Sequence, residues 1–335
     1  LTPNLIDRYY HYYIYVYYRI MSNFENLVSI IIPTFRGDHS IYKMCMELLK
    51  TFCDHKIEII VVNDCSPDNT HHECLKLVNE YPNQFTYIKL SKNVGEHNAV
   101  MAGLRYSNGD WVIIMDDDFQ NPPKEALKLL DYSTSNNFDV IYGDYGIKKH
   151  GFFRNLISKI NDHSANYILN KPRNLYLSSF KSISKKIVKK LTEYHGPYPY
   201  IDGLIISLTS NITSIKTQHD ERKIGSSGYS FLKLLKLYGN MATNFSTIPI
   251  HICSVAGLII ALISGIFAIA TVIEKIMNPS LLVGYTSIFI AIIFFAGVQL
   301  IFIGLLGEYI GKVLKNVNKE PQYFIDYIKL NESKK

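Results

Sequence analysis

The chain has 335 residues, enough for more than one folded unit, with 47% hydrophobic and 19% charged residues. Its net charge of +6 is too small and too dispersed to indicate a nucleic-acid-binding protein, but it suits a position beside anionic lipids. The five cysteines form no C-x-x-C pair and their number is odd. This pattern favours free thiols in a reducing compartment, with a metal site as the weaker alternative.

The N-terminal segment differs from the rest of the chain. Between Arg8 and Arg19 almost every residue is tyrosine, and the basic start, aliphatic core and cleavage site of a signal peptide are missing. We interpret residues 1–24 as an extension without a fold of its own, with Met21 as an alternative start of translation. An aromatic belt at a membrane interface is the other interpretation of this segment.

From Leu27 onward, short apolar runs rich in β-branched residues alternate with segments of helical periodicity. Strands are predicted at 27–32, 57–62, 85–90, 111–115 and 140–142, and helices at 41–52, 71–81, 96–107 and from residue 121 onward. In the last of these helices, Asn121 is the expected cap and the two prolines after it occupy the first turn. The alternation predicts an α/β fold with a doubly wound, mainly parallel sheet, whose ligand loops lie at the carboxyl ends of the strands.

Two long apolar segments follow a less regular region. Segments 248–273 and 281–306 contain no charged residue apart from His251 when it is protonated, and each exceeds the roughly 20 residues that cross a bilayer. Basic residues flank the pair on both outer sides, so two transmembrane helices are predicted, with both chain termini in the cytosol. Segments 152–169 and 229–238 are apolar and basic, as expected either of packed helices or of helices in the headgroup layer.

The predicted organisation therefore has three parts after the extension. A catalytic α/β domain covers 25–240, two transmembrane helices lie within 248–311, and a basic cytosolic tail covers 312–335. Glu308, just past the second span, is expected to pair with a nearby basic residue at the membrane interface.

Three consecutive aspartates follow the fourth predicted strand. In an extended turn Asp116 and Asp118 point to the same side, whereas Asp117 points elsewhere. Two carboxylates on one side can hold a divalent cation, Mg²⁺ or Mn²⁺, whose shell would be completed by diphosphate oxygens. Such an ion neutralises the charge that develops on a leaving nucleoside diphosphate. The alternative is a solvated turn whose acids cap the next helix.

Other turn sequences follow the first three predicted strands. Pro33-Thr34-Phe35 can present backbone groups and an aromatic ring to a nucleotide, and the Asp64 carboxylate can accept hydrogen bonds from a base or a ribose hydroxyl. Asn93-Val94-Gly95 ends in a glycine that permits close backbone approach. Each sequence alone is common in turns. Four such sequences at consecutive strand ends of one sheet indicate a nucleotide site.

The blocks VSIIIPTF, VVNDCSPDNT, LSKNVGEHNAVMAGL, GDWVIIMDDDFQNPP and GEYIGKVLKNVNKEPQY occur in this order. Together they resemble glycosyltransferase family 2, and within it the polyisoprenyl-phosphate glycosyltransferases, from about Leu27 to Tyr323. The resemblance implies a GT-A fold and a metal-dependent enzyme of hexosyltransferase type. The implied reaction is an inverting transfer from a nucleotide diphosphate sugar, with UDP preferred, to undecaprenyl phosphate or another polyisoprenyl phosphate.

The same resemblance implies a place and a purpose for the reaction. The location is the bacterial cytoplasmic membrane, with the catalytic domain on its cytosolic face. The lipid-linked sugar would serve the synthesis or modification of a cell-surface glycan. Relatives form oligomers through their membrane helices, so a homo-oligomer is a further expectation.

Residue roles follow from matching the family's motifs to this chain. The D-x-D pair falls on Asp116 and Asp118, which are the expected metal ligands and catalytic residues. The expected contacts to the nucleotide sugar are Pro33, Phe35, Asp64, Asn93, Asp116 and Gln120. A basic loop resembles the R-x-x-G-x-S-x-Y stretch of relatives, and in it Arg222, Lys223 and Ser227 are expected at the acceptor phosphate, with Arg222 also counted as catalytic. A surface loop against anionic lipid headgroups is the alternative.

Several positions depart from the family pattern. Asn63 and Cys65 replace an acid and a glycine, and Arg36-Gly37-Asp38 replaces Asn-Glu-Glu. Asn121 and Lys124 replace acids after the D-x-D pair, and Ser178-Ser179 stands where many relatives have an aspartate. Because of these departures, a non-catalytic membrane partner that retains the fold is kept as an alternative function. The intact pair Asp116 and Asp118 argues against it.

The nature of the acceptor decides whether a catalytic base is needed. A phosphate monoester has a second pKa near ~6, so a lipid phosphate is largely dianionic at cytosolic pH and needs no strong base. A saccharide acceptor would need one, and Asp202 is the only candidate, with a cap or a salt bridge as its alternative role. Trp111, the only tryptophan, begins a strand, which disfavours a processive synthase. His195 and His219 are interpreted as ordinary polar histidines.

Overall fold

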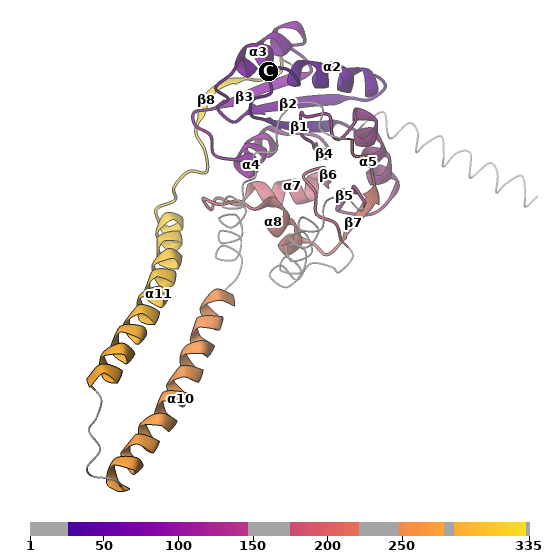
Figure 1. Ribbon diagram of the computed structural model, residues 1–335. Helices are drawn as coiled ribbons and strands as arrows, with labels where there is room; N and C mark the ends of the chain where they lie inside the picture. Colours follow the sequence, from indigo (N-terminus) through magenta and orange to yellow (C-terminus); the bar gives the residue numbers. More distant parts are fainter. Residues whose placement is uncertain (1–25, 147–174, 221–247, 278–284, 333–335) are drawn as a thin grey trace, which may run out of the picture. The chain divides into compact units, whose positions relative to one another are not determined.

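The computed structural model describes residues 26–146, 175–220, 248–277 and 285–332 (Figure 1). The described residues form two units, an α/β unit that combines residues up to 220 with the C-terminal 321–332, and a helical unit within 248–320. The predicted extension at 1–24 and the predicted apolar, basic segments 152–169 and 229–238 lie outside the described residues.

A mixed sheet forms the centre of the α/β unit, and its described strands have the order β7-β5-β6-β4-β1-β2-β3-β8. The strands are β1 (Val28–Thr34), β2 (Ile57–Asn63), β3 (Phe85–Leu90), β4 (Trp111–Ile114), β5 (Val140–Asp144), β6 (Lys181–Ser184), β7 (Ile212–Lys216) and β8 (Ile325–Lys329). The first four are parallel, whereas β6 runs antiparallel to β4 and β5, and β8 runs antiparallel to β3. The predicted α/β class with a mainly parallel central sheet is confirmed.

Helices cover both faces of this sheet (Figure 1). One face packs against α2 (Ile41–Thr51), α3 (Thr70–Glu80) and α5 (Pro123–Ser135), and the other against α4 (Glu96–Tyr106), α7 (Lys185–Thr192) and α8 (Ile201–Leu208). Successive residues of β1 serve the two layers in turn, with Ile30 in the first core and Ile31 in the second. A strand buried on both faces is a continuous apolar run in the sequence, which is why the sequence locates these strands well.

Helix α5 begins one residue later than its predicted cap implies. Pro122 is the N-cap, with extended backbone at φ −61° and ψ 145°, and Pro123 is the first helical residue. Asn121, predicted as the cap, instead donates a hydrogen bond from its amide to the Tyr145 hydroxyl at 3.3 Å.

The tail after the predicted spans is part of the sheet. Residues 325–329 form β8 at its edge, with Ile325 and Ile328 packed against the second core. This strand pairs with the backbone N–H and C=O groups on the outer edge of β3, which would otherwise be unpaired. The sequence prediction described 312–335 as a basic cytosolic tail and named no strand within it.

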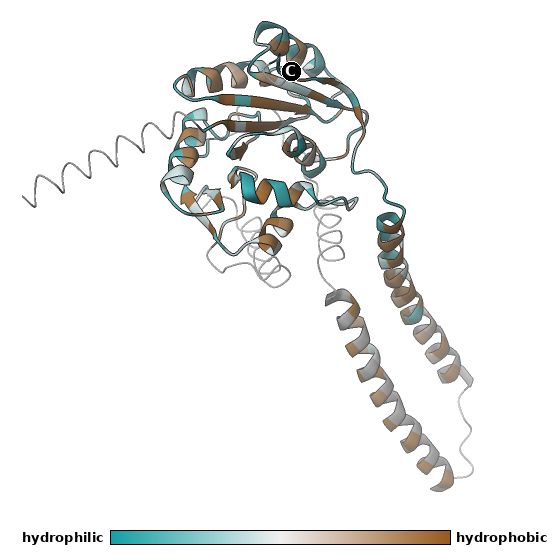
Figure 2. Ribbon diagram, turned by 180° about the vertical axis from the view of Figure 1, so that it is seen from behind, coloured by the Kyte–Doolittle hydropathy of each residue, from teal (hydrophilic) through white to brown (hydrophobic). Residues whose placement is uncertain are grey.

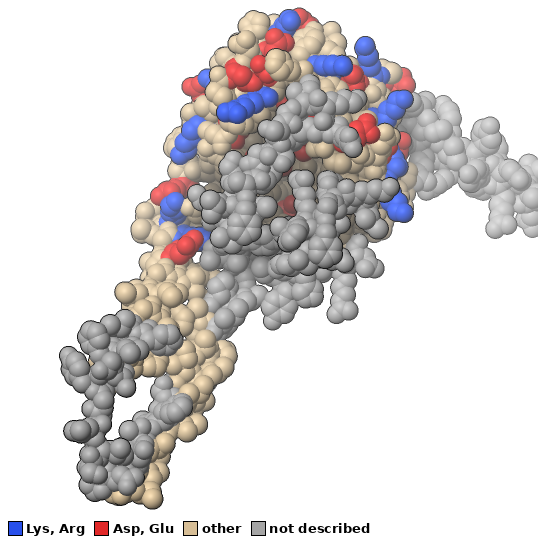
Figure 3. All heavy atoms as spheres, in the orientation of Figure 1, with Lys and Arg blue, Asp and Glu red and all other residues tan. Residues whose placement is uncertain are grey.

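The helical unit consists of α10 (Ile248–Met277) and α11 (Tyr285–Val317), which contain most of the two apolar segments predicted as spans. Among the described residues, one stretch is long and apolar enough for a membrane span, namely Phe295–Val317, with a mean hydropathy of 1.4. The described side chains of both helices are mostly apolar (Figure 2), and the visible face of these helices shows almost no charge along most of its length (Figure 3). Glu308 lies 3.7 Å from Lys312, the kind of pairing expected of it. Two membrane spans stay a prediction.

Candidate active site

A pocket of about 180 Å³ lies at the carboxyl edge of the central strands. Here β1 is flanked by β2 on one side and β4 on the other, so the strand order reverses, which is where α/β sheets bind ligands. The pocket is lined by residues from the ends of these strands and from the start of α4: Pro33, Thr34, Phe35, Asp64, Glu96, Ala99, Asp116, Asp117 and Asp118. Five of the predicted site residues therefore line one pocket, and the contacts of their loops determine how each side chain is oriented.

The three aspartates have different partners. Asp116 accepts a hydrogen bond from Ser179 Oγ at 2.8 Å, and Asp118 Oδ1 accepts one from the Gln120 backbone N–H at 3.1 Å. Asp117 Oδ2 instead accepts hydrogen bonds from Thr34 Oγ1 at 2.6 Å and Ser40 Oγ at 3.3 Å. Asp117 therefore fastens its turn to the loop after β1, and Asp116 and Asp118 are tied to other parts of the site.

Gly37 makes room for this anchor. A Cβ atom at this position would lie 2.1 Å from Asp117 Oδ2 and 2.2 Å from Thr34 Oγ1. Any larger residue would displace the hydrogen bond between these two side chains. The requirement for glycine here is steric and comes from the contact between two loops that are distant in the sequence.

The loops after β1, β2 and β4 each contain one non-glycine residue with left-handed backbone. These are Arg36, Cys65 and Phe119, with φ of 60°, 55° and 60°. Residues in such conformations persist where the surrounding structure fixes them, and they cluster at functional sites. Next to the first of them, the Phe35 side chain is 46% exposed, so its ring is available for stacking against a flat ligand.

Asp64 organises the next loop. Its Oδ1 accepts from the Val94 N–H at 2.8 Å and its Oδ2 from the Gly95 N–H at 2.9 Å. Burial raises the pKa of Asp64, and these two hydrogen bonds lower it, with burial the larger effect. Asn93 Nδ2 lies 3.3 Å from the Asp64 carbonyl O. Gly95 is the N-cap of α4 with φ 89°, which only glycine adopts without strain.

The pocket is strongly electronegative. The pKa of Asp117 is raised to about 6, mainly by burial and to a smaller extent by the Asp116 and Asp118 carboxylates, whereas the hydrogen bonds from Thr34 and Ser40 lower it. Glu96 is open to the pocket, yet desolvation by the surrounding protein raises its pKa to about 7, with Asp116 as the next cause. No sequence pattern singles out Glu96, because an acid in the first turn of a helix is common for reasons of the helix dipole alone.

Asp116 and Asp118 suit a hard cation. Carboxylate oxygens are the ligands that Mg²⁺ and Mn²⁺ prefer, and positive charge would relieve the repulsion among the carboxylates of this pocket. In the part of the chain that the structure describes, no three His, Cys, Asp or Glu side chains are arranged to hold a metal ion. The pair therefore fits an ion whose remaining ligands come from a bound diphosphate, which Mg²⁺ sites in nucleotide enzymes commonly use.

The raised pKa of Glu96 leads to a testable expectation. A carboxyl group with a higher pKa in the folded state binds more protons there than in the unfolded state, so stability decreases as the pH rises from its ordinary 4.5 through about 7. We expect Glu96→Gln to reduce the fall in melting temperature between pH 5 and pH 8. Thermal unfolding of both proteins in EDTA measures this, and equal falls would contradict it. Asp117 titrates in the same window but is present in both proteins.

A second group of contacts surrounds the turn after the three aspartates. The Asp220 backbone N–H donates to the Gln120 carbonyl O at 2.8 Å, and the His219 ring stacks on Tyr145 with centroids 4.0 Å apart. His219 Nδ1 lies 3.3 Å from Asn121 Oδ1. Gln120 and Asn93 flank the pocket without lining it.

Arg222, Lys223 and Ser227 lie outside the described residues. The structure does place Asp220, two positions before Arg222, against the turn that follows Asp118. Asp220 is the last described residue before the predicted acceptor loop.

Comparison with known proteins decides the family. The sequence model of the family Glycosyl transferase family 2 matches residues 29–192. The undecaprenyl-phosphate 4-deoxy-4-formamido-L-arabinose transferase of Yersinia enterocolitica is 30% identical over 315 residues, which is 92% of this chain and 96% of that protein. The chain belongs to glycosyltransferase family 2. The protein of the same name from Proteus mirabilis is 29% identical over 314 residues, with the same two coverages.

Among solved structures, glucosyl-3-phosphoglycerate synthase from Mycobacterium tuberculosis, in complex with Mn²⁺, UDP and glucosyl-3-phosphoglycerate, is similar with a TM-score of 0.47 and 14% identity. The match covers 65% of this chain and 76% of that one. At this level the likeness carries no further conclusion. The family and the mixed sheet confirm the expected glycosyltransferase with a GT-A-like fold.

Two departures from the family pattern have a physical account. Cys65 replaces a glycine and adopts left-handed backbone with φ 55°, at a cost of roughly 1 kcal/mol that glycine avoids. Asn63 replaces an acid and is fully buried, where its amide donates to the Tyr87 hydroxyl at 3.1 Å and its Oδ1 accepts from the Ser66 N–H at 2.8 Å. An uncharged amide avoids the cost of burying a carboxylate at this place.

Asp202 takes part in a buried ion pair. Its carboxylate binds Lys181 Nζ and accepts a hydrogen bond from the Tyr142 hydroxyl at 2.9 Å, and Lys181 is 3% exposed. This is the salt bridge expected as the alternative to a catalytic base. No sequence pattern indicates that Lys181 pairs with Asp202, because Asp202 lies 21 positions later in the chain, on α8.

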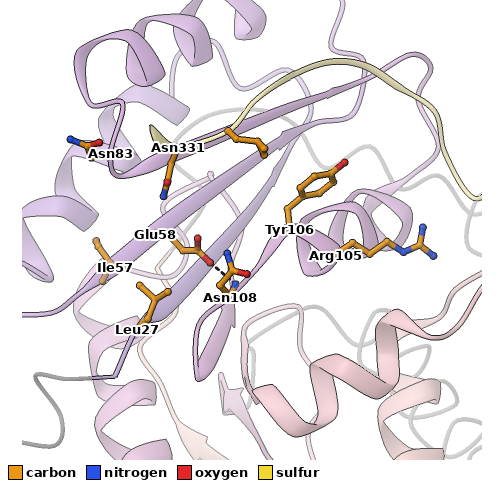
Figure 4. A pocket seen from close by; sticks show the side chains of 9 residues that line it. Leu27, Ile57, Glu58, Asn83, Arg105, Tyr106, Asn108 and Asn331 are labelled. Atoms are coloured by element: carbon orange, nitrogen blue, oxygen red, sulfur yellow. Dashed lines mark hydrogen bonds between the residues drawn. The ribbon is translucent and has the colours of Figure 1, made fainter. Parts of the chain in front are cut away.

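A second pocket of about 600 Å³ lies at the opposite edge of the sheet, where the parallel strands begin (Figure 4). Glu58 lines it from the start of β2 and accepts a hydrogen bond from the Asn108 backbone N–H at 2.6 Å. Arg105 and Tyr106 line it from the end of α4. None of the predicted site residues reaches this pocket.

Proposed function

We propose that this glycosyltransferase transfers a sugar from a nucleotide diphosphate sugar, UDP in preference to GDP, to undecaprenyl phosphate. The transfer inverts the anomeric centre and takes place at the cytosolic face of the bacterial cytoplasmic membrane. The product is a lipid-linked sugar for the synthesis or modification of a cell-surface glycan. The supporting observation is the Asp116–Asp118 pair in a pocket at the strand-order reversal, within a chain whose relatives over 92% of its length are named undecaprenyl-phosphate sugar transferases.

In this proposal the pocket holds the donor. Pro33 and the exposed Phe35 ring receive the base, and Asp64 keeps lone pairs for a base or ribose donor while it fixes the loop at Asn93. Gln120 follows the aspartate turn and supports the sugar side. A Mg²⁺ or Mn²⁺ ion bound by Asp116 and Asp118 would neutralise charge on the leaving diphosphate. Ser179 holds the Asp116 carboxylate in place.

The acceptor side needs cations more than a base. Because the lipid phosphate is already ionised, the protein must align it with the donor sugar and balance its charge. We assign this role to Arg222, Lys223 and Ser227, which follow Asp220 in the chain, and the Asp220 N–H binds the turn after Asp118. Asp202 is buried in its ion pair with Lys181, and in this scheme it has a structural role and not a catalytic one.

The helices α10 and α11 would hold the protein in the membrane that contains the prenyl acceptor. We propose that both span the bilayer, with both chain termini in the cytosol. Apolar side chains such as Ile259, Leu262, Ile266 and Ile269 are exposed on α10, as lipid contact requires. A homo-oligomer formed through these helices remains part of the proposal.

The acceptor can be tested with membranes that contain the full chain. Undecaprenyl phosphate and undecaprenol are offered with the same labelled nucleotide sugars, starting with the UDP-linked form of the sugar in the relatives' name. We expect label in the lipid phase with the phosphorylated acceptor alone. Label transferred to undecaprenol as well, or to a saccharide and not to either lipid, would replace the proposal with a hydroxyl-acceptor enzyme.

A further inference from the structure

The C-terminal segment Pro321–Glu332, which we name the C-terminal strap, is attached to the α/β unit by more than its strand pairing with β3. At the carboxyl end of β3 the Ser91 backbone N–H donates to the Phe324 carbonyl O at 2.9 Å, and Ser91 Oγ donates to the same oxygen at 3.2 Å. Lys89 and Asp326 form an ion pair at 2.6 Å. The strap therefore binds the end of β3 that leads into the candidate active site.

Arg105, in the last turn of α4, fastens the start of the strap. Its guanidinium donates to the Tyr323 hydroxyl at 3.1 Å, to Gln322 Oε1 at 3.1 Å and to the Tyr194 carbonyl O at 3.2 Å. Gln322 is 6% exposed and donates to the carbonyl oxygens of Tyr194 at 3.1 Å and Gly196 at 2.7 Å. The rigid fork of a guanidinium suits several acceptors at once, which a lysine would not.

The strap is linked to the donor pocket by two routes. Along the backbone, Ser91 begins the loop 91–95, and the N–H groups of its last two residues bind the pocket residue Asp64. Along α4, the first residue is the pocket residue Glu96, and Arg105 lies near the other end. The first route runs through the exposed residues 91–93, which the strap holds by the two hydrogen bonds to Ser91, and the second runs along the hydrogen-bonded helix α4, so we expect a displacement of the strap to change the walls of the pocket.

The strap also follows the second apolar helix directly in the chain. Helix α11 ends at Val317, and Gln322 is already fixed in the α/β unit, so residues 318–321 are the whole connection.

We propose that the C-terminal strap is a positioning element that acts through Arg105 and Ser91 on the donor pocket and thereby sets the pocket's affinity for a nucleoside diphosphate. This inference rests on the proposed binding of the donor in this pocket. Arg105, Gln322 and Tyr323 are positioning residues in this scheme, since none of them lines the donor pocket.

The test compares Arg105→Met with the wild-type full chain in lipid nanodiscs. We expect faster hydrogen exchange at residues 91–95 and 322–329, and a rise in the dissociation constant for UDP with Mn²⁺ of about fivefold, the equivalent of one net hydrogen bond. The turnover number should stay within about twofold while KM for the donor rises. Lys329→Met is the matched control, because its side chain binds Asn79 at 2.5 Å at the far end of the strap.

A second variant covers the case in which Arg105→Met does not fold. Tyr323→Phe removes one acceptor of Arg105 and keeps the ring, so we expect smaller changes in the same direction. Faster exchange at 322–329 without any change at 91–95 or in UDP affinity would overturn the proposal, as would unchanged exchange at 322–329. If the wild-type chain binds UDP but transfers no sugar, the proposed function fails while the exchange experiment still tests the strap.

Discussion

Replacing Asp118 with asparagine should lower the rate of sugar transfer by about 10²–10³-fold, the usual effect of removing one group that stabilises charge in a transition state. The substitution keeps the size of the side chain and its acceptor oxygen for the Gln120 N–H. It removes one of the two carboxylates proposed to hold the divalent cation. The remaining activity should need a higher Mn²⁺ concentration for half-maximal rate, which a metal titration of both proteins measures.

Asp110→Asn is the matched control for this variant. Asp110 is an acid before β4, at the opposite edge of the sheet from the pocket, and it pairs with the exposed Lys185 at 3.1 Å. Its replacement should leave the rate within about twofold, because an exposed ion pair contributes little. Equal activity of Asp118→Asn and the wild type at every Mn²⁺ concentration would remove Asp118 from the metal site.

Replacing Lys181 with methionine should destabilise the fold strongly. The substitution leaves the Asp202 carboxylate buried without its cation, which typically costs about 3–5 kcal/mol. Denaturant unfolding of the full chain in detergent measures this cost. The fluorescence of Trp111, the only tryptophan, reports on the event, because Trp111 pairs with Ser184 across β4 and β6.

Two further variants separate the ion pair from the general effect of losing a lysine. Lys185→Met removes the exposed cation beside Asp110 and should change stability by less than about 1 kcal/mol. The double variant Lys181→Met/Asp202→Leu removes both buried charges and should recover most of the loss. If the double variant were as unstable as the sum of its single variants, the pair would not be the cause.

The sequence located the central strands closely, because strands buried on both faces are unbroken apolar runs. β1 at Val28–Thr34 and β2 at Ile57–Asn63 lie within two residues of their predicted ranges. β6 and β7 were not predicted, since Lys181–Ser184 and Ile212–Lys216 are short and mix polar with apolar residues. β8 was taken for a tail, because only pairing with β3 identifies it as a strand.

The pocket could be predicted in outline from the same rule. Parallel strands end at one edge, so Phe35, Asp64 and Asp116 had to come together once their strands were known. Side-chain contacts between distant parts of the chain could not be predicted in this way, because no sequence pattern indicates them. The pairing of Lys181 with Asp202 and the contacts of Arg105 with the strap depend on register and packing that no short motif records.

The transfer of label from nucleotide sugars to undecaprenyl phosphate tests the central claim most directly. Membranes containing the full chain receive a panel of labelled UDP- and GDP-sugars, each with Mn²⁺, with Mg²⁺ and with EDTA, and Asp118→Asn runs beside the wild type. We predict label in the lipid phase from a UDP-sugar, lost with EDTA and strongly reduced in the variant. Binding of a donor in the pocket without lipid product from any sugar would contradict the account and favour a non-catalytic partner.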